Sequence, residues 1–246
     1  GSTGFPFGPP GAPEGFGTPA TFTEFNRALR ARVDVYMGNT DQALISLAES
    51  FLDTGASLDL GVYYSFGTGS GDLANALYDP SGRAILAHPS IETDAQLKTN
   101  GQPDDRLTRK VEELDEERTV QDITTDLVFT IYESNEAPIP IIRNEELILL
   151  RAEARLAEGD LPGATEDINH IRENSAGLPP LAGTPTAAQL LDEIVYNRRY
   201  SLLFEGGHRW IDARRLGRLN TLPRALPTHN IFSRFPLPEA ECLARV

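Results

Sequence analysis

The sequence predicts a mainly α-helical protein built from tetratricopeptide-like helical hairpins, with long irregular loops and few short strands. In two regions apolar side chains recur every three or four residues, the period of one helix face. Gly38-Asn39 and Gly159-Asp160 interrupt these regions, and Ala43 or Ala164 follows four residues after the Asn or Asp. A small residue there lets two helices approach closely, as in repeats of ~34 residues. Helical hairpins in general share this pattern, so both alternatives stay open.

The first elements follow from local composition. Residues 1–20 are mostly Gly and Pro, which favours an extended arm over a helix. The helical period starts at Thr21, and Thr21 or Thr23 is a suitable N-cap. The second helix of this hairpin is expected to close at Gly55, because Gly favours the end of a helix.

The remainder, residues 21–246, is expected to form a single domain with a loop-rich excursion over residues 56–142, where the helical period is lost. Within it, the acidic run EELDEE (112–117) is interpreted as a solvated face or loop. The segment DLVFTIY (126–132) could be a short strand. A long helix is predicted over residues 187–204.

The charge of the chain excludes one class of function. Its net charge of −14 argues against nucleic-acid binding, which relies on clustered Lys and Arg. Residues 1–140 hold 22 acidic and nine basic side chains, whereas residues 141–246 hold 14 and 13. Only Lys98 and Lys110 among the 22 basic residues are Lys, and Arg pairs better with buried carboxylates. Internal salt bridges are therefore expected in the balanced half.

Sequence motifs favour neither a metal nor a cofactor. The only Cys, Cys242, excludes an intrachain disulfide, and no two of the four His have the i, i+4 spacing of a metal site. The stretch GTGSGD (67–72) lacks the Gly-Lys-Ser/Thr ending of a phosphate loop. We also expect no membrane span and no secretory signal within the sequence.

The stretch FEGGHRWIDARR (204–215) concentrates charge around the chain's only Trp. Arg198 and Glu205 occupy positions that the helical period would give to apolar residues, so each needs a partner. If the helix continues, Glu205, Arg209 and Asp212 form an acid-base-acid ladder; if the Gly pair breaks it, the groups could meet across the bend. We interpret this cluster as an internal brace, with Trp210 in the core or donating its indole N–H to the network.

Four ordered blocks resemble the C-terminal half of the SusD/RagB family of nutrient-binding outer-membrane lipoproteins. They are RNEELILLRAEARLAEGD (143–160), INHIRENSAGL (168–178), NRRYSLLFEGGHRWIDARR (197–215) and FPLPEAE (235–241), with further similarity in GVYYSFGTGSGD (61–72) and DDR (104–106). The chain departs from the family in Asn197, where Glu is usual, in the extra Gly207, and in its roughly half length.

The resemblance implies structural roles for a set of polar residues, one aromatic residue and one glycine. These are Arg143, Glu146, Glu153, Asn169, Arg172, Arg198, Glu205, Gly206, Arg209, Trp210 and Asp212.

The resemblance also implies a function. Such a protein caps a TonB-dependent, SusC-like transporter at the outer-membrane surface, binds glycans or peptides without catalysis or cofactor, and is anchored through a lipidated Cys in a preceding part of the protein. Two alternatives stay open: a tetratricopeptide-type protein interaction scaffold, and a glycoside hydrolase, since two of the 36 acids could converge in a cleft.

Ligand sites in this family tend to lie on irregular excursions, where aromatic rings stack on sugars and polar side chains bind hydroxyls. The residues expected to do so are Tyr63, Tyr64, Phe66, Asp72, Asn75 and Tyr78. Ordinary packing of this loop on the helices is the alternative for its aromatic residues. Either way, recognition is expected to lie apart from the ionic cluster.

Overall fold

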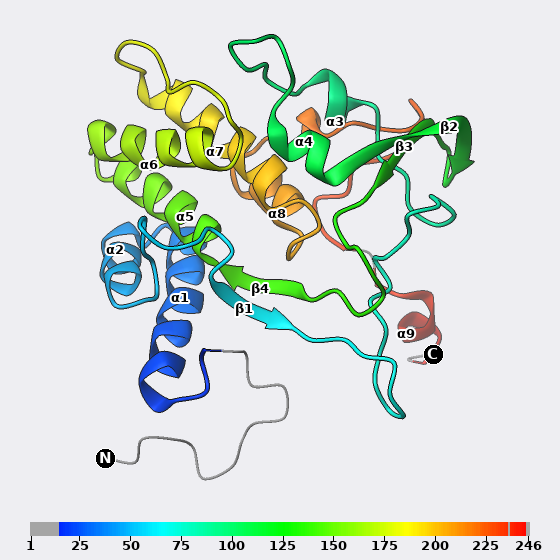
Figure 1. Cartoon of the computed structure of the whole chain (residues 1–246), viewed down its shortest axis with the longest axis horizontal. Coiled ribbons are helices and arrows are strands. Elements are labelled where there is room, and N and C mark those ends of the chain that lie inside the picture. The colour runs from blue at the N-terminus through cyan, green and yellow to red at the C-terminus, as the bar shows by residue number, and fades with distance from the viewer. Residues whose placement is uncertain (1–14, 236, 245–246) are drawn as a thin grey trace.

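A computed structural model describes residues 15–235 and 237–244 (Figure 1). The main helices are α1 (Pro19–Met37), α2 (Thr40–Ala48), α5 (Asn144–Ala157), α6 (Leu161–Asn174), α7 (Ala187–Ser201) and α8 (His208–Arg215). Shorter elements are α3 (Ser90–Thr93), α4 (Asp105–Lys110), the 3-10 turn η1 (Leu219–Thr221) and α9 (Glu239–Leu243). The strands are β1 (Gly61–Tyr64), β2 (Val111–Val120), β3 (Ile123–Phe129) and β4 (Ile139–Arg143). The mainly helical fold class is confirmed.

Two helical hairpins, α1–α2 and α5–α6, lie together with α7 on one side of the molecule, and β2 and β3 lie on the other (Figure 1). Helix α5 contacts α1, α2, α6 and α7. Ala43 and Ala164 are both fully buried where their hairpins pack, so the small residues after the turns do allow close approach. None of the described helices is both long and apolar enough to cross a membrane.

Helix α1 begins earlier than the sequence suggested. Its N-cap is Thr18, whose side chain accepts the N–H of Thr21, and Pro19 occupies the first helical position. The prediction of Thr21 or Thr23 as the cap is therefore wrong, because Pro in the first turn needs no N–H partner and already has helical φ. The expected arm at residues 1–20 lies mostly outside the described residues, and its last two residues are helical.

The end of the first hairpin also differs from expectation. Helix α2 stops at Ala48, well before Gly55, and Gly55 instead donates its N–H to the Asp53 carboxylate in a turn. The left-handed Gly38 ends α1 as predicted.

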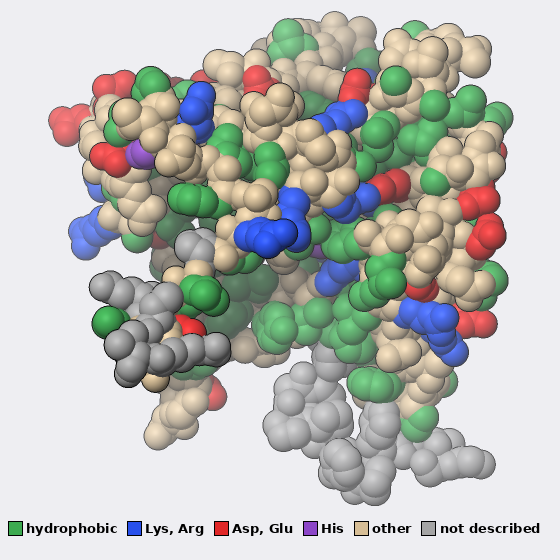
Figure 2. All heavy atoms as spheres, turned by 180° about the vertical axis from the view of Figure 1, so that it is seen from behind, with side chains coloured by type: hydrophobic (Ala, Val, Ile, Leu, Met, Phe, Trp, Pro, Cys, Tyr) green, Lys and Arg blue, Asp and Glu red, His purple; other side chains and the backbone are tan. Residues whose placement is uncertain are grey.

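The excursion over residues 56–142 contains more regular structure than its composition indicated. Strand β1 pairs with β4, and β2 pairs with β3, each as an antiparallel two-stranded sheet. The acidic run at 112–117 is part of β2, and its acidic side chains are exposed. Figure 2 views the molecule from behind, so the edge at which β2 lies in Figure 1 is on the left there, and acidic side chains gather at it. The short strand expected at 126–132 corresponds to β3, which begins three residues earlier.

Candidate ligand-binding site

The chain bends sharply between α7 and α8. Helix α7 ends at Ser201 and not at residue 204, and Phe204, Gly206 and Gly207 have φ values of 58°, 57° and 72°. These left-handed conformations cannot continue a right-handed helix. Glu205 is turned away from α8 and pairs with Arg143, so the expected ladder of Glu205, Arg209 and Asp212 is wrong.

A first ionic cluster surrounds Arg143 at the end of β4. Its Nε and Nη2 donate to the two carboxylate oxygens of Glu205, each at 2.9 Å, and its Nη1 donates to Glu145. Arg143 is only 4% exposed, and its Nη2 also donates to the carbonyl of Ser201 at 2.6 Å. Burial raises the pKa of Glu205 against the lowering effect of Arg143. The guanidinium is thus held by acceptors from three segments of the chain.

A second ionic cluster joins α5, α7 and α8. Arg198 and Arg215 both contact Glu153 and Asp212, with Arg198 Nη1 2.5 Å from Glu153 and 3.4 Å from Asp212. Although burial opposes the charge, these two carboxylates raise the pKa of Arg198. Asp212 thus pairs with Arg198 and Arg215 and not with Arg209, so the second interpretation, in which Glu205, Arg209 and Asp212 meet across the bend, is wrong as well.

Three other residues given structural roles make internal contacts. Glu146 accepts from Arg32 at 2.6 Å, and Asn169 accepts the N–H of Leu181 at 2.8 Å. Arg172 donates to Glu193 at 2.7 Å.

Arg209 and Trp210 depart from expectation. Among the residues that the structure describes, Arg209 has neither a hydrogen bond nor an ion pair, because the bend removes Glu205 from reach and Asp212 pairs with other arginines. Trp210 is half-buried, stacks on Phe235, and donates its indole N–H to the Phe232 carbonyl at 3.0 Å. It therefore lies neither in the core nor in the ionic network.

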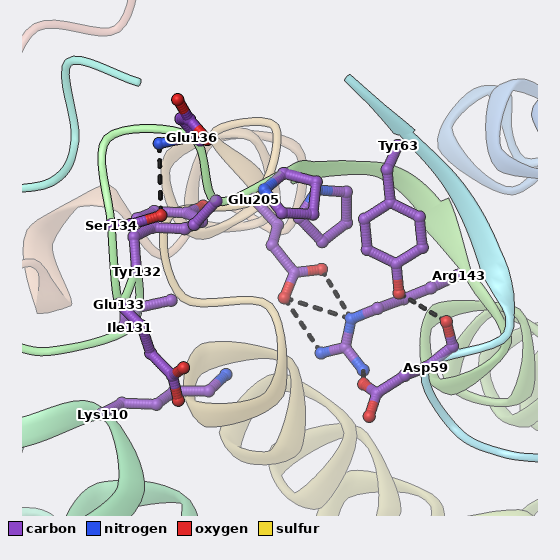
Figure 3. Close-up of a pocket in the computed structure, with 13 residues that line it drawn as sticks. Asp59, Tyr63, Lys110, Ile131, Tyr132, Glu133, Ser134, Glu136, Arg143 and Glu205 are labelled. Carbon is purple, nitrogen blue, oxygen red and sulfur yellow. Dashed lines mark hydrogen bonds and ion pairs between the residues drawn. The ribbon is translucent and has the colours of Figure 1, made fainter. Parts of the chain in front are cut away.

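A pocket of about 570 Å³ lies beside the bend, and we call it the tyrosine pocket (Figure 3). Its lining consists of Asp59, Tyr63, Lys110, Ile131, Tyr132, Glu133, Ser134, Glu136, Ala137, Pro138, Pro140, Arg143 and Glu205. In Figure 3, Tyr63 and Asp59 lie on one side, Ile131 and Glu133 lie on the other, and Glu205 lies between them. Arg143 and Glu205, which were expected to lie in a sealed ionic cluster, also line this pocket.

The tyrosine pocket combines an acidic rim with a basic group further in. Asp59 has a side chain that is 83% exposed, and Glu133 and Glu136 are exposed too. Lys110 donates to the carbonyls of Tyr200 and Ser201 at 2.8 and 2.6 Å, which leaves its third ammonium hydrogen for another acceptor. Burial, together with the nearby Arg143, lowers the pKa of Lys110 to about 8. Both hydrogen-bond donors and acceptors are thus offered to a ligand.

Of the six expected ligand residues, only Tyr63 lines this pocket. Its hydroxyl donates to the backbone carbonyl of Asp59, which fixes the ring. Tyr64 is 59% exposed and does not line the pocket, since successive side chains of a strand point to opposite faces.

The other expected ligand residues lie in the loop after β1. Phe66 is half-buried and Tyr78 is exposed. Asp72 accepts the N–H of Gly69 within a turn, at 3.1 Å. Asn75 is only 2% exposed and donates to the Ala137 carbonyl at 2.8 Å, so its amide stabilises the loop against the outer side of the pocket.

Sequence reasoning missed Lys110, Tyr132 and the rim acids at 133 and 136. Pairing of β1 with β4 brings the segment before β4 next to Tyr63, and nothing local in the sequence signals that pairing. Among the described residues, no three His, Cys, Asp or Glu side chains are grouped as metal ligands would be.

The fold resembles solved structures of the SusD superfamily. One from Bacteroides vulgatus superimposes with a TM-score of 0.59 at 17% identity, covering 89% of this chain and 60% of that one. A SusD-like protein from Bacteroides fragilis gives 0.61 at 15% identity, covering 79% and 54%. A SusD-like carbohydrate binding protein from Bacteroides fragilis gives 0.59 at 15% identity, covering 79% and 52%. The chain thus spans between about half and 60% of these relatives.

Two comparisons were made at the level of sequence, and one of them found the same family. A search of curated proteins found no match to the chain. Residues 120–232 match the model of the SusD family. The resemblance inferred from the sequence blocks is therefore confirmed: this segment carries the SusD family pattern, and the chain has the SusD-like fold.

Proposed function

We propose that the chain is a ligand-binding component of a nutrient-uptake system, and that the tyrosine pocket binds a neutral or basic oligosaccharide. The observation that carries this proposal is the position of Tyr63 in a pocket lined by both donors and acceptors. The description of one structural relative as carbohydrate binding supports it. A SusC-like TonB-dependent transporter as partner, a lipid anchor and an outer-membrane location are parts of the same proposal.

The charges of the pocket favour this class of ligand. Sugar hydroxyls can donate to the carboxylates of Asp59, Glu133 and Glu136, and they can accept from the Lys110 ammonium. The face of Tyr63 offers an apolar surface to the C–H groups of a sugar ring. Three exposed carboxylates on the rim would repel an acidic sugar, so neutral or basic residues are expected at this position.

Hydrolysis is the second candidate function, and Glu205 is the observation in its favour. Glu205 is a carboxyl group with a raised pKa beside a pocket, as a general acid would be. Both of its oxygens, however, accept N–H groups of Arg143, and a general acid needs a free oxygen to carry the transferred proton. We therefore propose binding without turnover.

A protein interaction scaffold is the third candidate, and the first hairpin provides its observation. Val33, Met37 and Ile45 are exposed apolar residues of α1 and α2. Such a face suits another helix, which in tetratricopeptide arrays is supplied by a neighbouring repeat.

A glycan array followed by titration calorimetry tests the proposal. We expect the wild-type chain to bind a neutral oligosaccharide, and Tyr63→Ala to bind it about tenfold more weakly, as loss of one stacking ring predicts. Tyr64→Ala is the matched control, since it removes the neighbouring exposed ring outside the pocket, and its affinity should equal that of the wild type. Equal losses in both variants would contradict this assignment, and release of new reducing ends during incubation would favour hydrolysis.

A further inference from the structure

A second pocket, of about 370 Å³, also borders the bend between α7 and α8, and we call it the apolar pocket. Its apolar walls come from Ile91, Phe129, Leu203, Phe204, Trp210 and Pro223. The rings of Phe129 and Phe204 meet edge to face at 4.5 Å. Phe204, which has a left-handed φ, lines the apolar pocket but not the tyrosine pocket, whereas Glu205 lines both.

Arg209 brings a positive charge without a directly bonded acceptor to the apolar pocket. It lines the pocket and, within the part of the chain that the structure describes, it has no acceptor. Its neighbour Arg199 is already held by Asp94 at 2.6 Å and by Ser90. Burial lowers the pKa of Arg209, and repulsion from Arg199 lowers it further, whereas the carboxylates of Asp212 and Asp94 oppose this shift without a direct contact. Arg209 is half-buried, and partial burial of a guanidinium without a directly bonded acceptor costs free energy, part of which an incoming anion would recover.

Two other charged side chains at this pocket, Arg198 and Glu205, already have ion-pair partners within the protein. Arg198 is paired with Glu153 and Asp212, and both Glu205 oxygens accept from Arg143. Glu205 is therefore not available to pair with Arg209, and Arg198 does not compete with it for an incoming anion.

His88 supplies a second donor to the same pocket. Its Nδ1 accepts the N–H of Ser90 at 3.1 Å, so the neutral ring carries its hydrogen on Nε2. That Nε2 has no partner among residues 15–235 and 237–244. Helix α8 also begins at this pocket, and its N-cap Gly207 has no side chain to accept the first free N–H groups. Three features of one pocket thus favour a negative ligand group.

We propose that the apolar pocket binds a small carboxylic acid with an apolar body, whose carboxylate pairs with Arg209 while the body lies between the aromatic walls. Walls that are mostly apolar with a few polar groups to fix orientation are typical of small-molecule sites. This ligand class differs from the neutral or basic oligosaccharide proposed for the tyrosine pocket. The two proposals can therefore fail independently.

The test uses 3-phenylpropionate as the probe and Trp210 as the reporter. Trp210 is the chain's only Trp and lines the apolar pocket, so selective excitation of indole reports binding at this site. We expect saturable quenching or a spectral shift. Neutral 3-phenylpropanamide, which has the same shape, should bind about tenfold more weakly, since charge-assisted hydrogen bonds are about twice as strong as neutral ones.

Arg209→Gln and Arg214→Gln form a matched pair for this test. Arg214 lies 5.5 Å from the Trp210 ring but does not line the pocket. Arg209→Gln should bind the acid and the amide equally, whereas Arg214→Gln should keep the wild-type preference, with calorimetry confirming both affinities. Tyr63→Ala should leave the probe affinity unchanged.

Two results would overturn the proposal. One is equal binding of acid and amide to the wild-type protein, or no saturable binding of either, which needs no variant. The other is a preference for the acid that survives in Arg209→Gln.

Discussion

At the scale of single residues, Glu205 connects the buried ionic cluster with the tyrosine pocket. Its carboxylate forms a two-point contact with Arg143, and its side chain is part of the pocket lining. Removing one partner of a buried ion pair leaves the other charge without compensation, which costs more than the pair itself contributes. Without Glu205, Arg143 would still pair with Glu145, so its charge would lose only part of its compensation.

We predict that Glu205→Ala lowers the free energy of unfolding by about 3 kcal/mol at pH 7. Chemical denaturation followed by circular dichroism measures it. Glu133→Ala is the matched control, because it removes an exposed acid from the same pocket, and we expect a change within about 0.5 kcal/mol. An unfolding midpoint of Glu205→Ala equal to that of the control would show that the pair does not stabilise the fold.

At the scale of elements, the bend between α7 and α8 determines both pockets. Four residues, Phe204 to Gly207, include three with left-handed φ, and this reverses the direction in which Glu205 points. An L-residue in that conformation brings its Cβ close to the following carbonyl oxygen. Gly207 avoids this strain, and a Cβ built on it would meet no atom within 4 Å, so only its backbone conformation demands glycine.

Gly207→Ala should therefore destabilise the chain by about 1 kcal/mol through backbone strain alone. Gly17→Ala is the control, since a Cβ there also meets open space and its φ is not left-handed. Thermal unfolding of the two variants measures the difference. A melting temperature of Gly207→Ala at or above that of Gly17→Ala would contradict a role for left-handed geometry in the bend.

The same elements show what the sequence could and could not predict. Helical hairpins were predictable because their apolar period and their Gly turns are local. The bend was half predictable: Gly206 and Gly207 suggested it, but the left-handed Phe204 did not. The tyrosine pocket depends on pairing of β1 with β4 across more than seventy residues, which no local pattern records. Lys110, the last residue of α4, was not expected either, because nothing local to it signals that it lines the same pocket as Tyr63.

At the scale of the whole molecule, the most connected helix supports the tyrosine pocket. Helix α5 contacts α1, α2, α6 and α7, and it begins directly after Arg143. Its first seven residues are all buried, which holds the end of β4 and the guanidinium in place. The loop at residues 131–138 then completes the pocket from outside, and Asn75 of the loop after β1 holds it through the Ala137 carbonyl. A rigid floor with loop-built walls is suited to binding different ligands on one fold.

The most direct test of the central claim is a crystal structure of the chain with a neutral oligosaccharide that it binds. Our account predicts a sugar ring against Tyr63, with hydroxyls in hydrogen-bond contact with the rim carboxylates of Asp59 or Glu133 and with Lys110. A sugar bound instead on the exposed loop near Tyr78, with the face of Tyr63 left to solvent, would contradict it.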